Sequence, residues 1–193
     1  MITQKTYALL ALTVYQASAE NTLDLPDPWI QTPQPTGTDG FAYAVYKNPS
    51  TNEVVISYRG TDNDVGDWTT NLGISTSQEK QAAAVYARVL HDYGIDAQGS
   101  NITFTGHSLG GGLAGTMAVW FNRPAVVFDP APSEVGAKYL LDVADVIGSL
   151  GANAPQSIND YVANITTQFA VRESNVTSYF IPGSIVHSTQ IFH

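Results

Sequence analysis

Residues 106–110 read Gly-His-Ser-Leu-Gly and set one serine between two glycines at a spacing that can make it a nucleophile. In this G-x-S-x-G pattern a sharp turn exposes the serine hydroxyl, and the glycines give the turn the room it needs. A strand-like run at 102–105 precedes the turn, and a helix-like run at 109–121 follows it. The context predicts that Ser108 is a nucleophile and that the backbone N–H of Leu109 points toward an oxyanion. The alternative is an ordinary glycine turn.

A serine hydroxyl needs a base to take its proton, and the chain has four histidines. His187 lies in a C-terminal loop after the strand-like segments, in keeping with a serine–acid–histidine chain order. We therefore predict His187 as the base, with His193 at the end of the chain as the alternative. His107 is expected to support the turn, and His91 to lie near a helix C-terminus, where its charge is favourable.

A second oxyanion donor is needed besides Leu109. The strand-like run at 54–58 ends in Arg-Gly-Thr-Asp, which places Thr61 in a turn directly after a strand. Thr61 can offer its N–H and its hydroxyl to an oxyanion. An ordinary β-turn with local hydrogen bonds explains the same residues equally well.

The order of the elements indicates an α/β fold. Residues 41–46 and 54–58 read as an antiparallel hairpin, and the strands that follow alternate with helices, as in a mostly parallel central sheet flanked by helices. The pattern predicts one domain over residues 1–193, and together with the serine motif, which is typical of the α/β-hydrolase superfamily, it predicts an α/β-hydrolase fold. Helices are expected at 3–19, 78–93, 109–121, 135–150 (with a break near Gly148) and 157–164, and strands at 102–105, 125–128, 167–171, 178–181 and 184–186.

The composition excludes several function classes. The net charge is −9 over 193 residues, so a nucleic-acid partner is not expected. There is no cysteine, which removes disulfides and thiol chemistry. We find no apolar run of the ~18 residues that a membrane span needs. No signal-peptide pattern is visible, which leaves a cytoplasmic location and non-classical export both open.

The motifs together resemble the class 3 (fungal-type) lipases, and most of all their compact bacterial relatives. The resemblance rests on Tyr-Arg-Gly-Thr at 58–61, Asp-Trp-Thr-Thr-Asn-Leu at 67–72 and Gly-His-Ser-Leu-Gly-Gly at 106–111, in that order. It implies that Ser108 is the nucleophile, that Thr61 and Leu109 form the oxyanion hole, and that His187 is the base. It also implies that no cofactor or metal is required.

The triad acid departs from the family pattern. The family aspartate follows the late strand expected at 167–171, and the equivalent position here holds Asn175, with Glu173 nearby. Asp129 follows the strand-like run at 125–128, at the sheet edge where catalytic groups gather, and pancreatic-type lipases carry their acid there. We predict Asp129 as the acid, with Asn175 and Glu173 as alternatives.

The expected activity is hydrolysis of lipid or other carboxylic esters (lipase, phospholipase or esterase) through an acyl-enzyme. Residues 62–67, where the family has an apolar lid, are short and acidic, so we expect little interfacial activation from them. The asparagine at the family acid position motivates a rival hypothesis, a weakly active or inactive hydrolase fold that serves as a binding module. The short stretch after His187 suggests that the domain is part of a longer protein.

Overall fold

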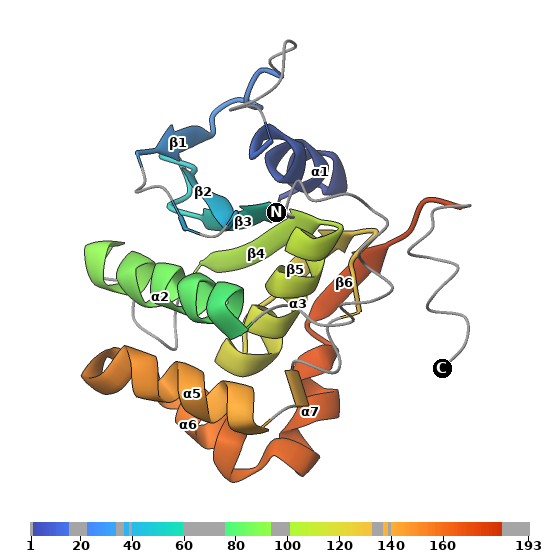
Figure 1. The fold of residues 1–193 in the computed structure, drawn as a ribbon. Coiled ribbons are helices and arrows are strands. Elements are labelled where there is room, and N and C mark those ends of the chain that lie inside the picture. Colours follow the sequence, from blue (N-terminus) through green and yellow to red (C-terminus); the bar gives the residue numbers. More distant parts are fainter. Residues whose placement is uncertain are drawn as a thin grey trace.

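The computed structural model describes residues 2–15, 23–33, 37–38, 40–59, 76–93, 101–132, 137–138 and 140–182. Within these residues a six-stranded sheet runs through the molecule in the order β1-β2-β3-β4-β5-β6 (Figure 1). The pairings of β1 with β2 and of β2 with β3 are antiparallel, and the remaining pairings are parallel. The strands are β1 (Ile30–Thr32), β2 (Ala42–Lys47), β3 (Val54–Arg59), β4 (Ile102–His107), β5 (Ala125–Phe128) and β6 (Val176–Tyr179).

Helices cover both faces of the sheet. Helix α1 (Gln4–Thr13) packs on one face, over β4 and β5. Helix α3 (Leu109–Phe121) lies on the other face, against β3, β4 and β5 (Figure 1). The helices that pack on or around α3 are α2 (Thr76–Tyr93), α5 (Leu140–Leu150), α6 (Gln156–Ala163) and α7 (Ile165–Glu173), with a short 3₁₀ turn at Gly151–Asn153.

The central strands alternate between two apolar cores. In β3, Val54 and Ile56 enter the core beneath α2 and α3, whereas Val55 enters the smaller core beneath α1. This alternation follows from the two-residue period of a strand buried on both faces. Of the described residues, none belongs to a helix long and apolar enough to cross a bilayer.

The structure confirms an α/β fold with a mostly parallel sheet, flanking helices and an antiparallel hairpin near the N-terminus. The helix at 109–121 and the strand at 125–128 have the predicted bounds. Helix α1 ends at Thr13, well before the predicted residue 19, and β1 was not predicted. The strand expected at 184–186 lies outside the described residues.

The prediction of a strand at 167–171 is wrong, because these residues belong to helix α7. Phe169 and Arg172 are three residues apart, so a helix places both on one face, and both are buried. The Arg172 guanidinium donates from Nη1 to the carbonyls of Val119 and Trp120 in the last turn of α3, at 3.2 and 2.9 Å. These tertiary contacts override the strand preference of the local sequence. The last parallel strand is instead β6.

The predicted break near Gly148 is also wrong. Helix α5 continues through Gly148 to Leu150. The helix ends just before Gly151, whose φ of 54° is left-handed and easily adopted by glycine.

Candidate active site

Ser108 lies in the sharp turn between β4 and α3, and we call residues 106–110 around this turn the elbow. Its φ is 58° and its ψ is −128°, a combination that non-glycine residues rarely adopt. Three backbone hydrogen bonds hold the turn: Ser108 N–H donates to Phe128 O at 3.0 Å, and Ser108 O accepts from Gly112 N at 3.1 Å and Ala131 N at 2.9 Å. The serine is therefore fixed both to its own helix and to the turn after β5.

The two glycines of the motif are required by close backbone contacts. A Cβ on Gly106 would lie 2.3 Å from the carbonyl oxygen of Gly110. A Cβ on Gly110 would lie 2.1 Å from the carbonyl oxygen of Tyr58 and 2.9 Å from the carbonyl carbon of Arg59. Both distances are far below any normal contact, so the predicted need for small residues is confirmed. The contact at Gly110 also brings the end of β3 against the elbow.

Asp129 follows β5 at the same edge of the sheet as Ser108. The parallel register pairs His107 with Phe128, so the residues that follow them are neighbours at the ends of adjacent strands. Asp129 is 3% exposed and has a φ of 41°. Its N–H donates to Tyr179 O at 2.7 Å, and its carboxylate Oδ1 accepts from Ile181 N–H at 2.8 Å.

His107 supports the elbow from the face that α1 covers. Its ring meets the ring of Tyr15 edge-on with centroids 6.3 Å apart, and the Tyr15 hydroxyl donates to His107 O at 3.3 Å. Burial lowers the pKa of His107, and the negative charge of Asp129 opposes that shift. The contacts with Tyr15 make His107 a packing group that supports the turn, as its position in the motif predicts.

Asn175 and Glu173 lie at the other edge of the sheet, where the parallel strands begin. Asn175 directly precedes β6, and its Nδ2 donates to Asn122 Oδ1 at 3.0 Å. Its carbonyl accepts from the N–H of Ala125, the first residue of β5. Glu173 is the exposed last residue of α7. The structure brings Asp129, and neither alternative acid, to the strand ends beside Ser108.

Of the other predicted site residues, Leu109 belongs to the described part of the chain and three do not. Leu109 is the first residue of α3, so its N–H belongs to the helix N-terminus, where amides lack helical partners. Thr61, His187 and His193 lie outside the described residues, as do residues 62–67. Before the segment that contains Thr61, the described chain ends at Arg59, which lies beside the elbow. Before the segment that contains His187, it ends at Pro182, the residue after Ile181, which is hydrogen-bonded to Asp129.

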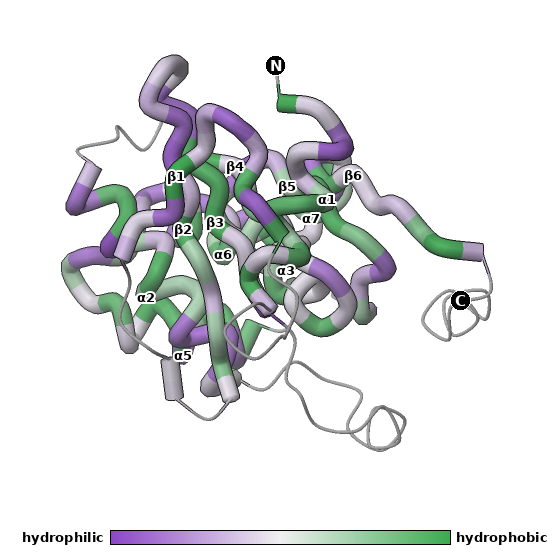
Figure 2. Tube along the Cα trace, turned by 90° about the horizontal axis from the view of Figure 1, so that it is seen from above, coloured by the Kyte–Doolittle hydropathy of each residue, from purple (hydrophilic) through white to green (hydrophobic). Residues whose placement is uncertain are grey.

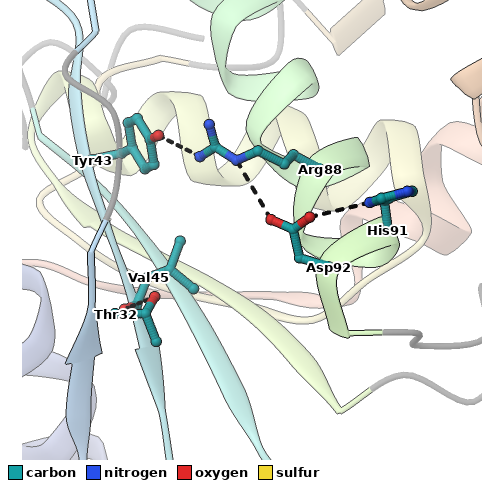
Figure 3. Close-up of polar contacts among 6 residues, drawn as sticks. All are labelled: Thr32, Tyr43, Val45, Arg88, His91 and Asp92. Atoms are coloured by element: carbon teal, nitrogen blue, oxygen red, sulfur yellow. Dashed lines mark hydrogen bonds and ion pairs between the residues drawn. The ribbon is translucent and has the colours of Figure 1, made fainter.

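His91 belongs to a separate polar cluster on α2 (Figure 3). Its Nδ1 lies 3.1 Å from Asp92 Oδ1, and its side chain is 88% exposed. Tyr93 follows two residues after His91, and Lys47 Nζ lies 5.2 Å from the centroid of the Tyr93 ring. Lys47 is paired with Val54, the first residue of β3, so it lies where the parallel strands begin. His91 therefore lies toward the edge of the sheet opposite Ser108.

No group of three or more His, Cys, Asp or Glu side chains within the described ranges could hold a metal ion. The tie from Ile181 to Asp129 was not predicted from the sequence. A backbone N–H leaves no motif in a sequence, and β6, the strand that positions this N–H, begins two residues before the strand predicted at 178–181.

Comparison with known proteins gives two findings. One relative, an extracellular phospholipase A1 of Serratia liquefaciens, is 36% identical over 96 residues, which cover 48% of this chain and 28% of that relative's length. A family model described as a Tle-like phospholipase domain, in the phospholipase-like group, matches residues 6–191. This match extends over nearly the whole sequence, and the chain therefore belongs to the Tle-like phospholipase domain family.

Proposed function

We propose that this domain is a serine hydrolase of the α/β-hydrolase type that cleaves a carboxylic ester of a phospholipid. The observation that carries the proposal is the pair of strand ends at which Ser108 and Asp129 lie side by side in constrained backbone conformations. Such backbone strain is concentrated at functional sites. Family membership and the phospholipase A1 relative support a lipid ester as the substrate.

In the proposed reaction Ser108 Oγ attacks the ester carbonyl carbon while His187 takes the hydroxyl proton. The Leu109 N–H and Thr61 stabilise the oxyanion. Protonated His187 then gives its proton to the departing alcohol oxygen, which leaves an acyl group on Ser108. Water, deprotonated by His187, attacks this acyl-enzyme; the bond to Ser108 Oγ breaks, His187 returns the proton to Ser108 Oγ, and the fatty acid is released.

We assign the triad acid to Asp129 over Asn175 and Glu173. The register places Asp129 next to Ser108, whereas Asn175 lies at the beginning of β6. Asp129 also directly follows β5, the strand after helix α3, and pancreatic-type lipases carry their acid after this strand, which supports the same choice. The role of the acid is to orient His187 and to stabilise its cation.

The class 3 lipase resemblance supports the roles of Thr61 and His187, and the described ends of the chain are compatible with both. Gly110 contacts the end of β3, so the chain enters the segment that contains Thr61 beside the elbow. Ile181 is bonded to Asp129, so the chain enters the segment that contains His187 beside the proposed acid.

The test is labelling with a fluorophosphonate at neutral pH, read by intact mass. Wild type should gain one adduct, and Ser108→Ala and His187→Ala should gain essentially none. Ser174→Ala is the matched control, because its exposed Oγ only donates to Val171 O at 2.6 Å. A folded wild type that takes no adduct would overturn the proposal and favour a binding module built on the same fold.

A further inference from the structure

The chain that leaves β6 carries exposed apolar side chains next to the proposed acid. Phe180 is 37% exposed and Ile181 is 63% exposed. Both follow directly on Tyr179, whose ring stacks on Phe128 with centroids 5.6 Å apart and an interplanar angle of 17°. Figures 1 and 2 show this segment projecting away from the described body of the protein, and Figure 2 shows its hydrophobic colour.

Two hydrogen bonds fix the start of this segment relative to Asp129. Asp129 N–H donates to Tyr179 O at 2.7 Å, and Ile181 N–H donates to Asp129 Oδ1 at 2.8 Å. The position of the exposed Ile181 side chain is therefore tied to the position of the proposed catalytic acid. An apolar group held there faces solvent at the edge of the sheet where the substrate must arrive.

We propose that residues 180–182 form the contact with a zwitterionic phospholipid surface. The proposal rests on the proposed function, because a phospholipid substrate is presented in such a surface. The net charge of −9 opposes binding to an anionic bilayer, so adsorption requires apolar contact and not charge attraction. The sequence of residues 62–67 is acidic and offers little apolar area, which leaves this contact to another segment.

A second exposed apolar pair supplies the matched control. Leu140 is 50% exposed and Leu141 is 77% exposed, at the start of α5. Helix α5 packs against α2 and α6, in the helical layer and not at the strand ends. If exposed apolar area alone drove adsorption, Leu140 and Leu141, which are the more exposed pair, would contribute at least as much as Phe180 and Ile181.

The test measures sedimentation with phosphatidylcholine vesicles, with every variant built on Ser108→Ala so that no lipid is hydrolysed. Phe180→Ser with Ile181→Ser keeps both backbone N–H groups and should lower the partition coefficient on the order of tenfold. Leu140→Ser with Leu141→Ser should stay within about twofold of the parent. Circular dichroism confirms that each variant is folded.

The proposal is overturned if the parent does not bind these vesicles, if both double variants bind equally, or if vesicles containing phosphatidylglycerol bind more tightly than pure phosphatidylcholine. Fluorophosphonate labelling of wild type is independent of all these outcomes. A failed labelling with intact vesicle binding would refute the serine mechanism alone, and the reverse result would refute the docking surface alone.

Discussion

The turns after β4 and β5 contrast with the helical layer formed by α2, α5, α6 and α7. In the turns, Ser108 and Asp129 have φ values of 58° and 41°, although neither is a glycine. In the helical layer a positive φ occurs at Gly151, where it costs little. Ser108 and Asp129 each hold backbone strain of roughly 1–3 kcal/mol.

Polar groups are also treated differently in the two regions. In the helical layer Arg172 Nη1 donates to three carbonyls, and the Tyr161 hydroxyl donates to Ala137 O at 2.7 Å. Such bonds add stability without exposing a reactive group. In the turns the bonds are mostly between backbone groups, and they fix the positions of Ser108 and Asp129. The comparison suggests that changes in the turns will act on activity, and changes in the helical layer on stability.

The largest effect should come from Asp129→Asn. The variant keeps an acceptor for Ile181 N–H and loses the charge that, in the proposed triad, stabilises the His187 cation. We expect kcat to fall by about 10⁴-fold with little loss of stability, because neutralising a triad aspartate costs about this much. Kinetics on a soluble short-chain ester would measure it. Asn175→Ala should change kcat less than about twofold, and a larger loss there than at Asp129 would reverse our assignment of the acid.

The two candidate acids, Asp129 and Asn175, show what the sequence can and cannot predict. The need for small residues around Ser108 was predicted because it is steric and local: Gly106 and Gly110 must be small whatever the rest of the fold does. Asn175 stayed open as an alternative acid because residues 167–171 were predicted to form a strand, after which the family acid would follow. The β-branched and aromatic residues there favour a strand. Packing of Phe169 and Arg172 on α3 decides for the helix, and no local pattern reveals that contact.

Glu79, in helix α2, differs from the hydrogen-bonded polar groups of the helical layer, and it gives the second prediction. Glu79 is 0% exposed, and neither carboxylate oxygen has a hydrogen-bond partner within the described part of the chain. Burial, and then the negative charge of Asp142, raise its pKa from 4.5 to about 8. The folded protein therefore holds this proton between those two pH values, whereas the unfolded chain releases it.

The sign of the effect follows from that difference. Since the folded state binds the extra proton, the free energy of unfolding falls as the pH rises from about 4.5 to about 8, then levels off. Glu79→Gln mimics the protonated form and should remove this loss. The variant should match wild type near pH 4.5 and exceed it at pH 9 by on the order of 3–5 kcal/mol. Urea unfolding at both pH values measures the gap, and parallel curves would show that Glu79 ionises normally.

Gly110→Ala tests the turns by steric means. The added Cβ meets the backbone of Tyr58 and Arg59, and backbone atoms cannot rotate away. The elbow must therefore shift relative to β3, and a displacement of about 1 Å at a catalytic group costs about 10²-fold in rate. We expect that loss of kcat together with a destabilisation of about 1–3 kcal/mol. If the variant keeps the wild-type kcat, the elbow tolerates movement. Close backbone packing would then no longer distinguish the turns from the helical layer.

The smallest effects should come from two glycines of the helical layer, and their signs should differ. A Cβ on Gly148 meets nothing within 4 Å, and the residue lies inside α5, so Gly148→Ala should stabilise the fold by about 0.5–1 kcal/mol. Gly151 also has open space around it, but its φ is 54°. Gly151→Ala should therefore destabilise by roughly 1–2 kcal/mol through backbone strain alone. Thermal unfolding would resolve the two shifts, while ester hydrolysis by both variants should stay at the wild-type rate. A change in that rate would mean that strain in the helical layer reaches the strand ends, so that the two regions are coupled.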